Sequence, residues 1–392
     1  MTCYWAPSDS LNRISDSLRK LSAKAILQAR KIRVRICFSS SGLWQKLFHT
    51  QSPAGKNYEP AEWSRALCLP GPDELQGLDL QVKSVFFLPI SIIHPKFVVI
   101  DRRRAFLPSC NVSWEEWFEG CVELGGSVVG QFVRFWEEFW ADEQDRGFAG
   151  TLPESLAETT THSSIKSAPL SGLLSHQTFD PAPEIATLFL PSPHHRNPRL
   201  RLPWQTAADA PSTPLNLFLQ QAFSSARSYI YIQTPNLTSR PAMAALLSAL
   251  SRGVRVDIVT SERLQLLEQL VTAGTTSPRC LSRLIAQHRS LANTHAADVE
   301  EAAALRLGRL KVSYYQPREG EGASHDEPVQ SHFKLTVVDG EVAVFGSGNM
   351  DRPSWYTSQE LGVAFLDRGF VAKVEEGVEE ALKGRRKVAF EQ

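Results

Sequence analysis

The sequence lacks an excess of charge, a metal-binding cysteine pattern and a long apolar run. Lysine plus arginine and aspartate plus glutamate each total 42 residues, so the formal net charge is zero. This balance removes the simplest argument for a nucleic-acid-binding protein, a strongly basic chain, although it leaves room for a local basic patch. The cysteines form no C-x-x-C pair, which argues against a zinc site or a disulfide framework and favours a reducing compartment. They are Cys3, Cys37, Cys68, Cys110, Cys121 and Cys280.

No stretch approaches the roughly 18 consecutive apolar residues that a membrane-spanning helix needs. The N-terminus also lacks a positive segment followed by an apolar run, so it predicts no secretory signal. We therefore expect a cytoplasmic protein, or one that is peripheral on an intracellular membrane.

What the sequence does have is an ordinary globular composition and an internal repeat. Hydrophobic residues make up 42% of the 392 residues and charged residues 21%, and this length predicts roughly two or three domains. In the second half, a β-rich run at 229–235 is followed by a helical pattern at 240–252 and an alternating strand at 254–259. The first half starts in the same order, with a β run at 3–7, a helix at about 10–29 and a strand at 32–38. Alternation of strand and helix predicts an α/β fold in each half.

The boundaries follow from composition. Residues 147–181 are rich in Ser, Thr, Pro and Gly and predict a linker. We expect an N-terminal domain at 1–145, a flexible linker at 146–180 and a C-terminal domain at 181–392. The helix predicted at 214–228 has no counterpart in the first half, so we expect either a first domain that lacks its leading helix or an N-terminally shortened sequence. The helical segment at 262–310 is the natural place for substrate contacts.

One motif occurs twice. His94, Lys96 and Asp101 form the pattern H-x-K-x4-D, and His332, Lys334 and Asp339 repeat it at the equivalent point of the second half. Two copies at matching places are far more specific than a single short motif.

The spacing of the motif has a physical meaning. Residues i and i+2 of a strand face the same way, so each histidine is expected to share a face with its lysine. The opposite face is then left for the core, and it would carry Pro95, Phe97, Phe333 and Leu335. An imidazole beside an ammonium group suits an anionic phosphate.

A second polar cluster follows each motif. Asn111 and Asn349 both lie 17 positions after their histidines, the latter in the run Gly346-Ser347-Gly-Asn349. Glu119 and Glu360 follow 25 and 28 positions after the histidines.

This pattern resembles the phospholipase D superfamily, and its second copy is most similar to cardiolipin synthases. The resemblance covers both halves, but the first copy departs from the pattern at Pro108 and Cys110. It implies two pseudo-symmetric α/β/α sandwich domains packed around one shared active site, working without a metal or other cofactor.

The resemblance also implies roles. His94 would attack phosphorus and form a phosphohistidine, and His332 would give a proton to the leaving alkoxide. The phosphoryl oxygens would be held by Lys96, Lys334, Asn111, Ser347 and Asn349. Glu119 and Glu360 would bond the far ring nitrogens of the histidines, and the motif aspartates Asp101 and Asp339 would lie at strand ends and bond nearby groups.

Three functions compete at this point. The first is a phosphodiesterase or phosphatidyltransferase acting on phospholipid, with possible peripheral contact to a membrane and no obligate protein partner. The second is an endonuclease or other nucleic-acid phosphodiesterase with the same chemistry. The third is a catalytically impaired binding protein.

Other features have two interpretations each. Aromatic residues at 114–140 suit a membrane-facing surface, but the helical spacing at 131–140 favours core packing. The basic runs at 102–104 and 383–387 suit either anionic lipid or a solvated surface.

Overall fold

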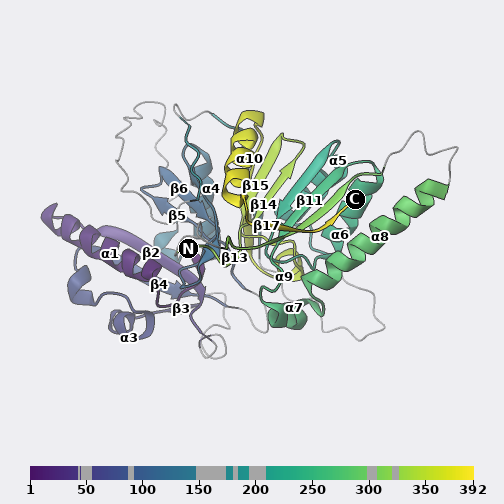
Figure 1. The fold of residues 1–392 in the computed structure, drawn as a ribbon. Helices are drawn as coiled ribbons and strands as arrows, with labels where there is room; N and C mark the ends of the chain where they lie inside the picture. Colours follow the sequence, from purple (N-terminus) through teal and green to yellow (C-terminus); the bar gives the residue numbers. More distant parts are fainter. Residues whose placement is uncertain are drawn as a thin grey trace.

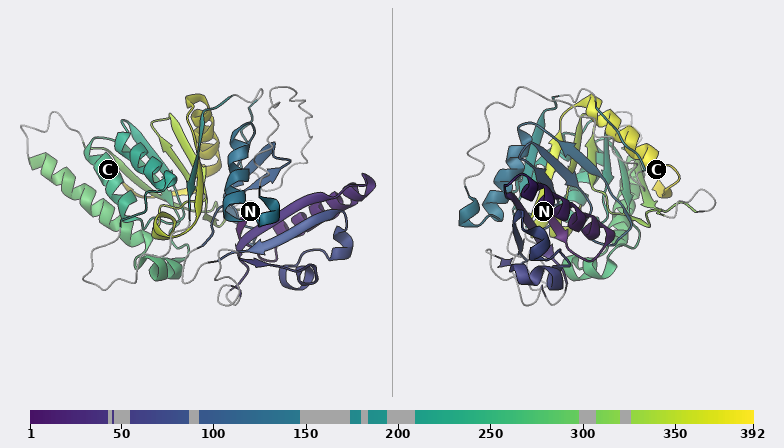
Figure 2. Two further views of the ribbon diagram at one scale, coloured as in Figure 1. Left: turned by 180° about the vertical axis from the view of Figure 1, so that it is seen from behind. Right: turned by 90° about the vertical axis from the view of Figure 1, so that its left-hand side faces the viewer.

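The computed structural model describes residues 1–42, 45, 55–86, 92–146, 174–179, 184–193, 209–297, 307–319 and 326–392. It is an α/β protein whose two halves lie side by side, with the first half and its helix α1 at one end and the long helix α8 at the other (Figure 1). Two further views show helices packed on the outside of the sheets in both halves (Figure 2). The predicted α/β class is therefore confirmed.

The first half is built on four strands in the order β1-β2-β4-β3, in which β1, β2 and β4 run parallel. Three further strands of this half form an antiparallel sheet in the order β5-β6-β8, and β7 pairs with β13 of the second half. Two backbone bonds between Met1 and Phe97 connect these sheets. The elements are β1 (Thr2–Tyr4), α1 (Asp9–Leu27), β2 (Ile32–Ser40), β3 (Lys56–Asn57), η1 (Pro60–Glu62), α3 (Trp63–Leu67), η2 (Pro72–Leu75), β4 (Leu78–Ser84), β5 (Val98–Ile100), β6 (Arg104–Pro108), β7 (Trp117–Phe118), β8 (Cys121–Leu124), α4 (Val128–Phe139) and η3 (Glu143–Asp145).

The second half is built on eight strands in the order β17-β12-β11-β10-β14-β15-β16-β9. The predicted helices and strands around residues 214–260 are present, and the segment after residue 262 contains two helices, α7 and α8, within its described residues. The elements are β9 (Thr187–Ser192), α5 (Pro214–Ser225), β10 (Tyr229–Gln233), α6 (Arg240–Ser251), β11 (Arg255–Thr260), α7 (Leu266–Ala273), α8 (Ser277–Ala297), β12 (Leu310–Tyr315), β13 (Gln330–Ser331), β14 (Leu335–Val338), β15 (Val342–Gly346), α9 (Arg352–Tyr356), β16 (Glu360–Phe365), α10 (Arg368–Leu382) and β17 (Arg386–Glu391).

Local sequence explains where α6 begins and ends. Ser239 caps its first turn by accepting a hydrogen bond from the backbone N–H of Ala242, and Pro241 sits in the first turn, where its missing N–H costs nothing. Gly253 follows the helix with φ of 91°, a backbone conformation that glycine adopts without strain.

The large sheet separates two cores. One face packs against α5, α6 and α8. The other face packs against α10 and also against β5, β6, β8 and α4 of the first half, so the halves share one hydrophobic core. Phe132 and Phe135 of α4 are buried in it, as the core interpretation of the aromatic residues predicts, whereas Trp114 is exposed.

The predicted linker lies mostly outside the described residues. Residues 174–179, at its C-terminal end, pack against α10, where Phe179 stacks on Phe370 with ring centroids 5.4 Å apart. Among the described residues, no helix combines the length and the apolar character needed to cross a bilayer.

Candidate active site

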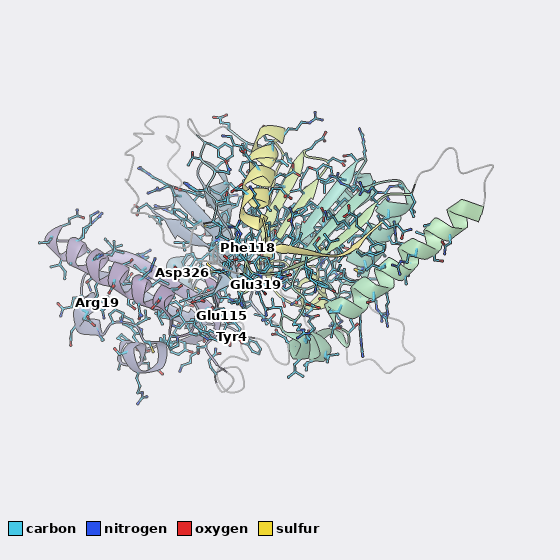
Figure 3. The ribbon with its side chains drawn as sticks, in the orientation of Figure 1. Tyr4, Arg19, Glu115, Phe118, Glu319 and Asp326 are labelled. Carbon is cyan, nitrogen blue, oxygen red and sulfur yellow. The ribbon has the colours of Figure 1, made fainter. Side chains whose placement is uncertain are left out.

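Short strand pairings carry each histidine motif into the other half. β13, directly before His332, pairs in parallel with β7 of the first half, and the backbone N–H of His332 donates to the carbonyl of Phe118 at 3.0 Å. The pairing has a counterpart, because the backbone N–H of His94 donates to the carbonyl of Gln359 at 2.9 Å. Phe118 accordingly lies where the two halves meet (Figure 3).

These pairings correct one expectation. The histidines and lysines of the motifs precede the strands instead of lying in them, because β5 begins at Val98 and β14 at Leu335. The backbone N–H of each histidine bonds to the opposite half instead of its own sheet. The predicted apolar face still packs inward, with Phe97 and Phe333 both buried.

Each motif histidine pairs with a glutamate from the other half of the chain. Nδ1 of His94 lies 2.9 Å from Oε2 of Glu360, and Nδ1 of His332 lies 2.6 Å from Oε1 of Glu119. An ionised carboxylate only accepts hydrogen bonds, so each ring carries its proton on Nδ1 and directs Nε2 away from the glutamate. Each imidazole is thereby fixed in tautomer and orientation by a residue from the other repeat.

Burial and charge set the protonation states in this cluster. Burial lowers the pKa of His332 to about 3, more than the attraction of Glu119 offsets, and burial also lowers the pKa of His94. Although burial opposes it, the attraction of His332 lowers the pKa of Glu119 to about 2. Glu360 also has a lowered pKa, because the attraction of His94 exceeds the effect of burial. Without a bound anion, both imidazoles are therefore neutral at pH 7 and both glutamates are ionised.

Serine hydroxyls hold the two glutamates. Ser347 donates to Oε2 of Glu360 at 2.5 Å, and Ser109 donates to Oε2 of Glu119. Ser354 adds a third bond, to Oε1 of Glu360 at 2.7 Å.

This contact corrects the expectation that Ser347 holds a phosphoryl oxygen. Ser347 is 1% exposed, and its proton is committed to the carboxylate. Ser109, which the sequence reasoning missed, stands in the same place in the first half. The signal was available, because each serine lies two positions before its asparagine.

The departure at Pro108 leaves this arrangement unchanged. The backbone N–H of Ser109 donates to the carbonyl of Gly120 at 2.8 Å, as that of Ser347 donates to Leu361 at 2.9 Å. The return bonds also match, since the N–H groups of Gly120 and Leu361 donate to the serine hydroxyls. The first half can carry Pro108 where the second half carries Gly346, because the hydrogen bonds at this point are made by the next residue, Ser109 or Ser347.

Both motif lysines are buried in the cluster. Lys96 is 1% exposed and donates to the carbonyl of its own His94 at 3.0 Å; Lys334 is 3% exposed and donates to the carbonyl of His332 at 2.5 Å. Lys334 also lies 2.9 Å from Nδ1 of His332, but a ring N–H that donates to Glu119 has no lone pair left there, so this is an electrostatic contact.

The lysine charges reach across the halves. Lys334 lowers the pKa of His94, and Lys96 lowers that of His332. Burial lowers the pKa of Lys334 itself to about 7, partly opposed by Glu119. The motifs are therefore close enough to act on each other as one electrostatic unit.

The asparagines are placed differently. Oδ1 of Asn111 lies 3.4 Å from the backbone N–H of Tyr4, and among the described residues its Nδ2 makes no hydrogen bond. Nδ2 of Asn349 donates to Asp351 at 2.9 Å, while Oδ1 is buried with no partner in the described part of the chain. Asn111 therefore keeps two amide donors for a ligand, whereas Asn349 has one engaged.

The structure does not bring the motif aspartates to the histidines. Asp339 sits in the turn after β14 and accepts the backbone N–H groups of Arg227, Ser228 and Tyr229 at 2.8, 2.8 and 3.0 Å. Asp101 lies exposed in the equivalent turn, also with a positive φ. Asp339 bonds nearby groups at the end of a strand, as expected for both residues. Neither Asp339 nor Asp101 contacts the imidazoles.

Fold and site together define a class of protein: a repeated α/β unit in which two H-x-K-x4-D motifs of the phospholipase D type converge. Comparison with known proteins agrees, because residues 219–382 match the family model for the cardiolipin synthase, PLD-like domain. The predicted resemblance to the phospholipase D superfamily is confirmed.

Cardiolipin synthase A of Pseudomonas entomophila is 25% identical over 315 residues, which cover 76% of this chain and 49% of that protein. The same-named protein of Pseudomonas putida KT2440 is 27% identical over 191 residues, covering 48% of this chain and 32% of that one. The chain thus spans about half the length, or less, of these curated relatives.

Two solved structures are similar as well. A phosphatidylserine synthase from Haemophilus influenzae gives a TM-score of 0.48 with 15% identity, over 97% of this chain and 85% of that one. Nuc, a phospholipase D family member from Salmonella typhimurium, gives 0.32 with 17% identity, over 52% of this chain and 98% of that one.

Proposed function

We propose that this protein is a phosphodiesterase or phosphatidyltransferase that acts on phospholipid through a phosphohistidine intermediate. The crossed histidine–glutamate pairs carry the proposal. Two neutral imidazoles anchored through Nδ1 leave both Nε2 atoms for chemistry at phosphorus, and two buried lysines supply positive charge for its oxygens.

The reaction proceeds in two displacements. Nε2 of His94 attacks phosphorus, the bond from phosphorus to the leaving oxygen breaks, and His332 gives that oxygen a proton from Nε2. Water or an acceptor alcohol then attacks the phosphohistidine, passes its proton to His332, and the phosphorus–nitrogen bond breaks. No step requires an oxidant, a reductant or a second substrate other than the acceptor.

The acid role depends on the arriving anion. The ligand-free site holds His332 neutral, so it needs a proton before it can act as an acid. A phosphodiester placed between the lysines brings negative charge next to the imidazole and raises its pKa, and Glu119 stabilises the resulting imidazolium. The family resemblance assigns the nucleophile to His94, and the low pKa of His332 suits a neutral nucleophile equally well. The position of the covalent adduct therefore decides the roles.

The test uses the purified chain with phosphatidylglycerol, phosphatidylcholine and single-stranded DNA in separate assays. His94→Ala and His332→Ala should each lower lipid turnover at least about a thousandfold. His176→Ala is the matched control, because His176 is exposed and outside the site. Hydrolysis of DNA alone would overturn the lipid substrate, and full activity of either site variant would overturn the mechanism.

A trapped intermediate separates the two histidines. Mass spectrometry after rapid quenching in alkaline denaturant, which preserves the acid-labile phosphorus–nitrogen bond, should find the phosphatidyl adduct on His94 in the wild type. An adduct on His332 would reverse the roles while preserving the two-step reaction.

A further inference from the structure

Helix α7 presents its apolar side to solvent. Leu267, Leu270 and Val271 are 76%, 44% and 67% exposed, while the polar Gln269 on the same helix is 4% exposed. This is the reverse of the usual arrangement, in which a surface helix turns its apolar side inward.

Four hydrogen bonds hold the helix in this rotation. The Gln269 amide nitrogen donates to the carbonyl of Leu264 at 2.7 Å and to Oδ1 of Asn236 at 2.8 Å. Its amide oxygen accepts the backbone N–H of Ser277 at 2.6 Å and the hydroxyl of the same residue at 2.9 Å. A buried amide with all these bonds made would lose them if the helix turned its leucines inward. The outward apolar side is therefore built into the fold.

The helix lies beside the candidate active site. α7 packs against α9, the short helix that follows Asn349 and Asp351. The Arg352 guanidinium, at the start of α9, donates to the carbonyl of Thr272 on α7 at 3.2 Å. Figure 1 draws α7 below α9, at the lower edge of the second half.

The segment that carries this apolar side has a net positive charge, although the exposed Glu268 lies on α7 itself. α8 begins three residues after Gly274 and carries Arg279, Arg283 and Arg289, all exposed, with no acidic residue along its length. Over residues 262–297 there are four arginines and two glutamates. An apolar ridge beside exposed arginines is complementary to an anionic lipid surface, with acyl chains for the leucines and phosphate groups for the guanidinium groups.

We propose that the outer side of α7, together with the arginines of α8, is the surface through which this protein adsorbs to an anionic phospholipid bilayer. The choice of a bilayer rests on the proposed function. Leu267, Leu270 and Val271 enter the interfacial layer. α9 connects this surface to the site, because its Ser354 bonds Glu360, the partner of His94. A substrate phosphodiester reaches the site without leaving the membrane surface.

The test measures adsorption apart from chemistry. Flotation with vesicles of phosphatidylcholine plus phosphatidylglycerol compares the wild type with the triple variant Leu267→Gln, Leu270→Gln and Val271→Gln. The partition coefficient of the variant should fall at least about tenfold. Leu217→Gln is the matched control: Leu217 is 49% exposed on α5, away from α7 (Figure 1), and its loss should leave partitioning unchanged. Arg279→Gln with Arg283→Gln should weaken binding to these vesicles and leave binding to pure phosphatidylcholine unchanged.

A soluble phosphodiester, bis(4-nitrophenyl) phosphate, separates this proposal from the proposed function. The triple variant should hydrolyse it as the wild type does, which also shows that the site is folded. A wild type that binds neither kind of vesicle would overturn the inference, as would wild-type partitioning by the triple variant. A wild-type dimer that the triple substitution converts to a monomer would overturn it too, since α7 would then be a contact between copies. If the wild type binds vesicles through α7 but turns over no lipid, the surface stands and the function fails.

Discussion

Replacing Glu119 by glutamine tests whether the crossed pairs control the reaction. The carboxylate lies 2.6 Å from Nδ1 of His332, and its pKa falls from an ordinary 4.5 to about 2 although burial opposes the fall. This drop corresponds to about 3 kcal/mol of preference for the ionised form, of which His332 supplies the largest favourable part, ahead of Lys334 and Ser109. Glutamine keeps an oxygen that can accept from Nδ1 but removes the negative charge that favours an imidazolium.

If His332 must carry a proton in the transition state, the Glu119→Gln variant loses most of the stabilisation that the carboxylate gives to the imidazolium. A loss of about 3 kcal/mol lowers kcat roughly a hundredfold. The pH–rate profile should shift as well. Glu119 raises the pKa of His332, so removing its charge lowers that pKa further. The alkaline limb of a rate that depends on protonated His332 then moves to lower pH.

The assay is release of headgroup from phosphatidylglycerol in mixed micelles over a range of pH. Glu123→Gln is the matched control, because this glutamate lies on β8, four residues after Glu119, exposed and paired with Arg104. Glu360→Gln should reproduce the loss through His94. Rates for Glu119→Gln within about twofold of the wild type, with unchanged limbs of the profile, would refute the reasoning.

Three further predictions concern stability. Asp339→Ala should lower the free energy of unfolding by about 2 kcal/mol, because three backbone N–H groups lose their acceptor. Asp101→Ala, at an exposed turn, should change it by less than about 0.5 kcal/mol. Equal effects of the two substitutions in urea titrations would contradict this contrast. Gly120→Ala should destabilise by about 2 kcal/mol or more, since its Cβ would lie 2.3 Å from the buried ring of Phe333, and an unchanged Tm would disprove this. The free energy of unfolding should fall as the pH drops from about 6.5 toward 3, because the unfolded chain protonates His332 in this window while the folded chain, with a pKa of about 3, does not. His332→Asn should flatten that slope, and a flat wild-type curve would count against the buried neutral imidazole.

The sequence by itself determined the α/β class, the repeat and both histidine motifs. These are local properties: strand and helix periodicity repeats within about 20 residues, and each motif spans eight. The same local spacing put each asparagine and glutamate near its own histidine along the chain. It also placed the histidines in strands, whereas the structure has each of them just before its strand.

The tertiary structure alone decided which glutamate serves which histidine. The two pairs join residues 266 and 213 positions apart, and they exist because β13 and β7 pair across the halves. Spacing along one repeat cannot encode a contact that forms only when the repeats dock. The serines show the same limit: Ser347 looked like a phosphate ligand from its motif, but packing turned its hydroxyl onto Glu360. The outward rotation of α7 is likewise set by the bonds of Gln269 to other segments, not by the helix's own pattern.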